Sequence, residues 1–286
     1  ARKNVERVLG ECSRICQGAC IHGALGEAFT EAIGSDTTID SEHVTLDDIR
    51  KKGKELCTAG STCHGVGHAI FQQTRNFDDA LSVCSDIAPR GLTVHCDRGV
   101  FMEYADARAA RSVLSDTPQV PMTLKQLDAL CVRRSIVESR ACFIYLPKMV
   151  EVTLAEDDQQ TDAITRVREL CMTLSGETRL ACIAGIGGYR SAYMFAHPMT
   201  VRNLCNSFTA ASERASCAAG LSTMAAEHEE RIKNTFAFCG SFTEEVVAVA
   251  CYEGVYATYA ILHTPEGAEA LCESDSRCLK ATEAGR

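Results

Sequence analysis

Two histidines spaced four positions apart are the residues of this chain best suited to chemistry. His64 and His68 lie in the stretch CTAGSTCHGVGHAIFQ, residues 57–72. Positions i and i+4 share one face of a helix, so two imidazoles with this spacing can hold a single metal ion. The spacing therefore predicts a transition-metal site centred on this pair.

Further ligands are expected from residues near the same position in neighbouring parts of the chain. His22 precedes a glycine, as His64 does, and His95 lies directly before a cysteine. Glu103 or Glu27 can add a carboxylate. Two or three histidines with one carboxylate suit zinc, iron, copper or manganese.

A metal at this place would have candidate catalytic residues beside it. If the ion acts as a Lewis acid or redox centre, we expect Arg98, Glu103 and Tyr104 to surround a substrate. The first hypothesis is thus a metalloprotein in which the metal also serves catalysis.

The H-x3-H pattern is also compatible with less specific roles. It occurs by chance on many helices, and a buried histidine commonly only donates a hydrogen bond to backbone. A non-catalytic binding or scaffold module for a protein, peptide or small-molecule ligand is the second hypothesis, and metal capture or storage is the third. The motif is not H-E-x2-H, which argues against a zincin-type protease.

The elements that would position these histidines are marked by cysteines. The chain has 17 cysteines in 286 residues, and no C-x2-C pair typical of zinc or iron–sulfur sites occurs. The commonest spacing is eleven or twelve positions, which favours disulfides and an oxidising compartment. We therefore expect a periplasmic or secreted protein.

A short amphipathic run precedes the first cysteine of each pair, and an apolar, alanine-rich run follows the second. This pattern predicts an all-α protein: a disulfide-stapled array of about seven to eight helical hairpins, similar in general terms to α-solenoids. Each disulfide would stabilise its hairpin by about 3 kcal/mol. The predicted pairs are Cys57–Cys63, Cys84–Cys96, Cys131–Cys142, Cys171–Cys182, Cys205–Cys217, Cys239–Cys251 and Cys272–Cys278.

A glycine usually follows the second cysteine three positions later, as at Gly99, Gly185, Gly220 and Gly254. Glycine lets two helix backbones approach closely. We therefore expect the second helices of successive hairpins to stack side by side.

No change in composition divides the chain, so a single helical-repeat domain over residues 1–286 is expected. Its parts are an N-terminal unit with an insertion (1–56), the stapled hairpins (57–271) and a C-terminal cap and tail (272–286). The N-terminal unit holds Cys12, Cys16 and Cys20, and the odd total leaves one thiol without a disulfide partner.

The net charge of −9 argues against a nucleic-acid partner. Nucleic-acid binding needs clustered Lys and Arg, which an acidic chain with a pI near 5.4 does not favour. No uninterrupted apolar run of 18 residues occurs, so no membrane span is expected. A small-molecule or peptide ligand remains the expected partner.

Overall fold

The computed structural model describes residues 29, 44–89, 91–110, 122–156, 162–226, 231–262, 272 and 275–284. These residues form helices joined by short turns, with no strand among them, which confirms the all-α prediction. The chain divides into two compact units, Ala1–Val120 and Pro121–Arg286. The helical repeat runs through both, and the prediction of one domain over 1–286 stays a prediction.

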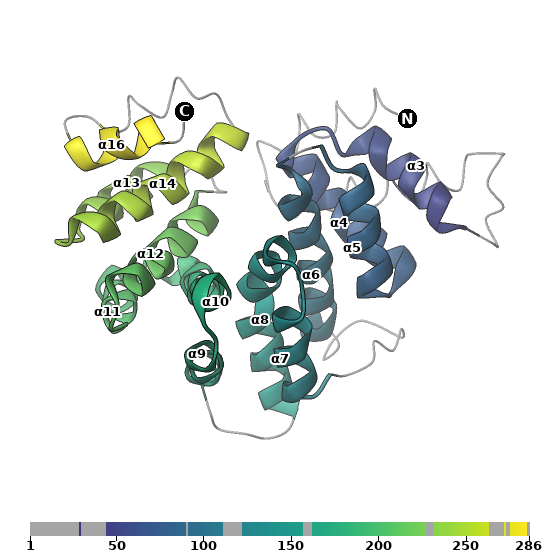
Figure 1. The fold of residues 1–286 in the computed structure, drawn as a ribbon, viewed down its shortest axis with the longest axis horizontal. Coiled ribbons are helices and arrows are strands. Elements are labelled where there is room, and N and C mark those ends of the chain that lie inside the picture. Colours follow the sequence, from purple (N-terminus) through teal and green to yellow (C-terminus); the bar gives the residue numbers. More distant parts are fainter. Residues whose placement is uncertain are drawn as a thin grey trace. The chain divides into compact units, whose positions relative to one another are not determined.

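The first unit contains two helical hairpins in its described part (Figure 1). In each, a shorter first helix leads into a longer second helix, and the two second helices pack against each other. The helices are α3 (Leu46–Leu56), α4 (Gly60–Thr74), α5 (Phe77–Ile87) and α6 (Thr93–Ala110).

In its described part, the second unit contains four hairpins, followed by one further helix. Successive second helices are neighbours: α8 packs on α10, α10 on α12, and α12 on α14, with α16 added to α14. The elements are α7 (Leu124–Val132), α8 (Ile136–Glu156), α9 (Ala163–Thr173), α10 (Gly176–Tyr189), η1 (Ser191–Tyr193), α11 (Pro198–Asn206), α12 (Ala211–Ala225), α13 (Ile232–Gly240), α14 (Glu245–Leu262) and α16 (Ser276–Ala284).

Capping side chains begin several of the first helices. Asn76 Oδ1 accepts hydrogen bonds from the backbone N–H groups of Asp78 and Asp79 at the start of α5. Thr123 and Gln126 form a reciprocal capping box at the start of α7. Each such cap stabilises its helix by about 1 kcal/mol.

All seven predicted disulfides are present, one for each hairpin and one at α16. The second helices begin earlier than expected. In α8, α10, α12 and α14 the second cysteine is the seventh residue of the helix, so the turn is shorter than the gap between the cysteines. The disulfide therefore joins the end of the first helix to the second turn of the next one.

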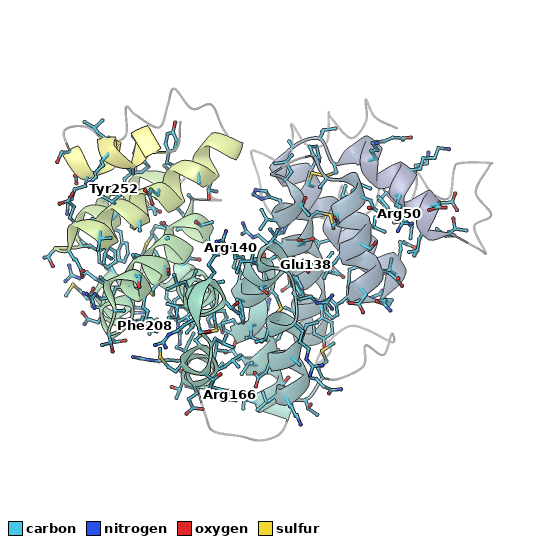
Figure 2. All side chains as sticks on the ribbon, viewed as in Figure 1. Arg50, Glu138, Arg140, Arg166, Phe208 and Tyr252 are labelled. Carbon is cyan, nitrogen blue, oxygen red and sulfur yellow. A yellow bond between two sulfur atoms is a disulfide. The ribbon has the colours of Figure 1, made fainter. Side chains whose placement is uncertain are left out.

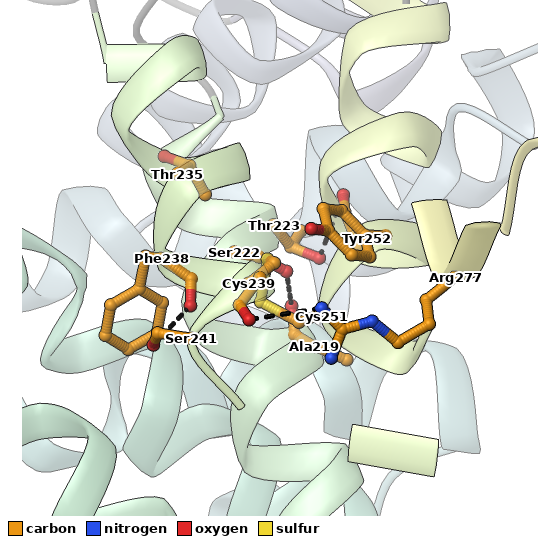
Figure 3. Close-up of a disulfide and its surroundings, with 12 residues drawn as sticks. Ala219, Ser222, Thr223, Thr235, Phe238, Cys239, Ser241, Cys251, Tyr252 and Arg277 are labelled. Carbon is orange, nitrogen blue, oxygen red and sulfur yellow. Dashed lines mark hydrogen bonds between the residues drawn. A yellow bond between two sulfur atoms is a disulfide. The ribbon is translucent and has the colours of Figure 1, made fainter. Parts of the chain in front are cut away.

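Glycines allow the second helices to touch backbone to backbone, as predicted. A Cβ atom at Gly99 would overlap the carbonyl oxygen of His64, and one at Gly220 would overlap that of Ala184. Gly254 lies in the same way against Ala219. Around the Cys239–Cys251 disulfide, Ser222 Oγ also donates to this Ala219 carbonyl, at 3.0 Å (Figure 3).

Arginines connect neighbouring hairpins within each unit. Arg50 of α3 donates to Asp86 of α5 at 2.8 Å, and Arg166 of α9 pairs with Asp128 of α7 (Figure 2). Two further arginine contacts occupy equivalent positions in successive hairpins. Arg168 donates to the Ser207 carbonyl and Arg202 donates to the Ser241 carbonyl, and each arginine lies three positions before the first cysteine of its hairpin.

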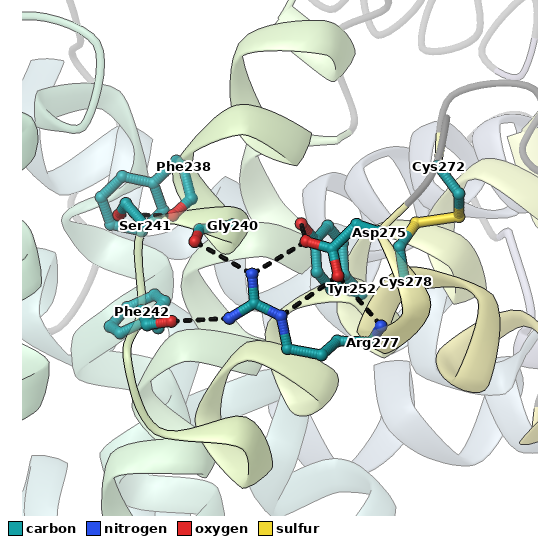
Figure 4. A network of polar contacts seen from close by, with 9 residues as sticks. All are labelled: Phe238, Gly240, Ser241, Phe242, Tyr252, Cys272, Asp275, Arg277 and Cys278. Carbon is teal, nitrogen blue, oxygen red and sulfur yellow. Dashed lines mark hydrogen bonds and ion pairs between the residues drawn. A yellow bond between two sulfur atoms is a disulfide. The ribbon is translucent and has the colours of Figure 1, made fainter.

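The helix α16 is attached by a polar network (Figure 4). The Arg277 guanidinium donates to the carbonyls of Gly240 and Phe242 and to the Asp275 carboxylate. Tyr252 of α14 donates to the same carboxylate at 2.9 Å. These bonds and the Cys272–Cys278 disulfide hold the C-terminal helix against the last hairpin.

No helix in the described part of the chain is long and apolar enough to cross a membrane.

Candidate metal centre

The histidine pair lies where α4 and α6 approach most closely. A Cβ at Gly67 of α4 would overlap the Cys96 carbonyl, and Gly99 of α6 faces the His64 carbonyl in return. His68 follows Gly67 directly, and Glu103 lies one turn after Gly99. The close backbone contact thereby brings an imidazole of α4 to a carboxylate of α6.

The side chains of His64, His68 and Glu103 contact one another in this order, with His68 in the middle. The Nε2 atoms of His64 and His68 are 3.2 Å apart, and Nδ1 of His68 is 3.0 Å from Oε2 of Glu103. The two imidazole rings are tilted by 63° to each other. His68 is 5% exposed, whereas His64 is only partly buried and reaches solvent.

The carboxylate determines which nitrogen of His68 carries the proton. An ionised Glu103 can only accept, so Nδ1 of His68 donates to it and, in the neutral ring, the Nε2 lone pair faces His64. Burial raises the pKa of Glu103, but hydrogen bonds from His68 and Gln72 and the charge of Arg75 outweigh it and hold the pKa below its ordinary value. Glu103 is therefore ionised at neutral pH and, by accepting from Nδ1–H, keeps the Nε2 lone pair of neutral His68 available to a metal ion.

Gln72 is a part of this site that the sequence reasoning missed. It lies four residues after His68, as His68 lies four after His64, so the three share one face of α4. The signal was present in the spacing, but Gln72 carries no charge and was not considered as a partner for a carboxylate.

No group of three or more His, Cys, Asp and Glu side chains placed to hold one metal ion occurs among the residues that the structure describes. Glu103 approaches His68 on Nδ1, on the other side of the ring from His64. The predicted ligand His22 and the alternative carboxylate Glu27 lie outside the described residues, as do Cys12, Cys16 and Cys20.

His95, the fourth predicted metal ligand, is 6% exposed near the start of α6. Burial and the charge of Arg98 lower its pKa to about 4, so it is neutral at pH 7. In the described part of the chain its side chain makes no hydrogen bond to His64 or His68. Its role as a ligand stays a prediction.

The predicted catalytic residues occupy different environments on α6. Glu103 lies against the histidine pair. Tyr104 is 3% exposed and packs edge-on against Phe71 and Phe77, with ring centroids 6.0 and 5.0 Å apart, so its ring belongs to the core. Arg98 is 2% exposed, and its role in catalysis stays a prediction.

Comparison of the chain with protein-family models, with curated proteins and with solved structures finds no match. The function is therefore argued from the chain's own residues.

Proposed function

We propose that the protein binds a transition-metal ion between Nε2 of His64 and Nε2 of His68, with Glu103 orienting His68 from behind. The observation that carries this proposal is the 3.2 Å separation of the two nitrogens. Two nitrogens bound to one tetrahedral ion at about 2.0–2.1 Å lie about 3.3 Å from each other. The pair thus fits an ion with little movement of either ring.

The hydrogen bond to Glu103 supports the same assignment. Metal-binding histidines almost always donate their second ring N–H to a carboxylate or carbonyl, which fixes the ring and raises its basicity. The His68–Glu103 bond of 3.0 Å has this form. A direct hydrogen bond between the imidazoles would also give a short separation, so metal analysis is the deciding experiment.

Two protein nitrogens leave coordination positions for His22, water or a substrate. The partial exposure of His64 gives an ion access from solvent, and the net charge of −9 attracts cations. An ion with open positions suits catalysis, whereas a filled coordination sphere suits capture or storage.

The seven disulfides fit an oxidising compartment. We place the protein in the periplasm or among secreted proteins, where metal sites have access to external ions.

The test uses the whole, oxidised chain purified without a histidine tag. Metal content is measured as purified and after addition of zinc, copper, iron or manganese followed by dialysis. We expect one transition-metal ion per chain, lost in the His64→Ala/His68→Ala double variant and kept in His197→Ala, whose histidine is exposed at the start of α11. Unchanged metal content in the double variant, or no metal and no change in melting temperature with any of the four ions, would overturn the proposal.

A further inference from the structure

A cavity of about 530 Å³ lies in the second unit, away from the histidine pair. Its size is within the range of small-ligand sites. It is bounded by α9, the end of α10, η1 and α11, and its lining residues are Asp162, Ile164, Thr165, Arg168, Arg190, Tyr193, His197, Thr200, Val201 and Leu204.

Arg190 is the charged group of this cavity with the weakest protein partners. Its guanidinium is 3.6 Å from Asp162, beyond normal hydrogen-bond distance. Asp162 is itself engaged in capping α9, where it accepts from the Thr165 N–H at 3.0 Å. Within the described part of the chain the Arg190 guanidinium makes no hydrogen bond.

Two tyrosine rings lie close to this guanidinium. Its central carbon lies 4.8 Å from the Tyr193 ring centroid and 5.6 Å from that of Tyr189. Cation–π contacts of this kind use the face of each ring and consume none of the N–H donors of the guanidinium, which can bind an anionic group in a bidentate manner.

Arg168 supplies a second guanidinium to the same cavity. It is held by two hydrogen bonds of 2.9 Å to the hydroxyl and carbonyl of Ser207, and its central carbon lies 4.8 Å from the centroid of the Phe208 ring. These two bonds use two of its five N–H donors. Two cationic groups thus face one carboxylate in an otherwise acidic protein.

Apolar and aromatic groups complete the cavity. Leu204 is partly exposed, whereas Val201 and Ile164 are only 2% and 6% exposed and add little open surface. Tyr193 is 51% exposed and adds an aromatic surface to the lining of the cavity. The cavity therefore combines positive charge with apolar surface.

We propose that this cavity binds a small organic anion, whose carboxylate or phosphate pairs with Arg190 and Arg168 while its apolar body lies against Leu204 and Tyr193. This site is independent of the metal centre. Arg168 also has a structural role, since Arg202 makes the equivalent contact one repeat later. Arg190 lies between α10 and η1, and its guanidinium makes no hydrogen bond in the described part of the chain. The proposal therefore rests chiefly on Arg190.

The test is calorimetric titration of the oxidised full chain with 4-phenylbutanoate and phenyl phosphate, and with 4-phenylbutanamide as the neutral match. We expect at least one anion to bind and the amide to bind about tenfold more weakly. The Arg190→Gln substitution should raise the dissociation constant of the anion about tenfold. Tighter binding of the carboxylate or of the phosphate identifies which anionic group the site prefers.

Two matched variants separate ligand contact from general charge and from repeat packing. Arg140→Gln removes the same charge at an exposed position outside the cavity, and we expect unchanged binding. Arg202→Gln and Arg168→Gln each remove an equivalent hydrogen bond to a serine carbonyl of the next hairpin. Only Arg168→Gln should lower the affinity for the anion. Equal binding of anion and amide, equal losses in Arg190→Gln and Arg140→Gln, or no binding of either anion at millimolar concentration would overturn the proposal.

Discussion

Gly99 of α6 lies directly against the carbonyl oxygen of His64 in α4. The helix contact that recurs along the repeat therefore also sets the position of the histidine pair. Equivalent glycines in the second unit, Gly220 and Gly254, face Ala184 and Ala219 instead. The same packing rule thus places a histidine pair beside the contact of α4 and α6, and small residues with their hydroxyl hydrogen bonds beside the contact of α12 and α14.

Replacing Gly99 by alanine is expected to separate α4 from α6. The added Cβ meets backbone, which cannot move aside as a side chain can, so we expect a loss of about 2 kcal/mol in the free energy of unfolding. Gly188→Ala is the matched control, because the nearest atom there is in the flexible Met224 side chain, at 3.0 Å. Chemical denaturation of both variants checks this, and an equal loss in the two would contradict it.

The disulfide pairing and the stacking of second helices followed from local sequence. Cysteines eleven or twelve positions apart, with one helical run before the first and another after the second, indicate a disulfide that joins the two helices of a hairpin. A glycine three positions after the second cysteine marks most of the contacts between second helices. The starts of the second helices were placed too late, because the prediction relied on the apolar run after the second cysteine as the beginning of each helix. At the start of α8, Ser135 and Glu138 form a reciprocal capping pair, an S-x-x-E signal that the sequence reasoning did not use.

The candidate sites were predictable to different extents. The i, i+4 spacing identified His64 and His68, but the side of His68 that Glu103 occupies depends on the crossing of α4 and α6. The cavity beside Arg190 was not predicted, because its walls come from α9, η1 and α11, and no spacing rule joins them.

Removing the Cys239–Cys251 disulfide is expected to destabilise the last hairpin. The bond closes a loop of 12 residues, for which the chain-entropy model gives about 3 kcal/mol. The Cys239→Ala/Cys251→Ala variant should unfold at lower denaturant concentration than the oxidised parent protein. Under strong reductant the difference should largely disappear, and a difference that survives full reduction would show that packing, not the cross-link, is responsible.

The network around Asp275 predicts a specific dependence of stability on pH. Hydrogen bonds from Arg277 and Tyr252 outweigh desolvation and hold the pKa of Asp275 well below its ordinary value. A carboxylate with a depressed folded-state pKa stabilises the fold above its unfolded pKa of about 4 and loses this contribution as pH falls below that value. Asp275→Asn should therefore cost about 1–2 kcal/mol at pH 7.

The difference between the parent protein and Asp275→Asn should shrink steadily below about pH 4. Asp47→Asn is the control, because its side chain is 91% exposed and its ion pair with Arg50 contributes little. Unfolding free energies measured across the pH range decide the matter. A difference that stays constant in acid would mean that the Asp275 carboxylate charge is not what stabilises α16.

Replacing Glu103 by glutamine tests whether this carboxylate orients a metal-binding histidine. The amide can donate as well as accept, so it no longer fixes the Nδ1–H tautomer of His68. We expect metal affinity to fall about 10- to 100-fold, less than the complete loss in His64→Ala/His68→Ala. Competition with a chelator of known affinity measures the change, and Glu253→Gln, at an exposed position on α14, should bind as the parent does. Metal affinity in Glu103→Gln equal to that of the parent would show that the His68–Glu103 hydrogen bond belongs to packing between α4 and α6 alone.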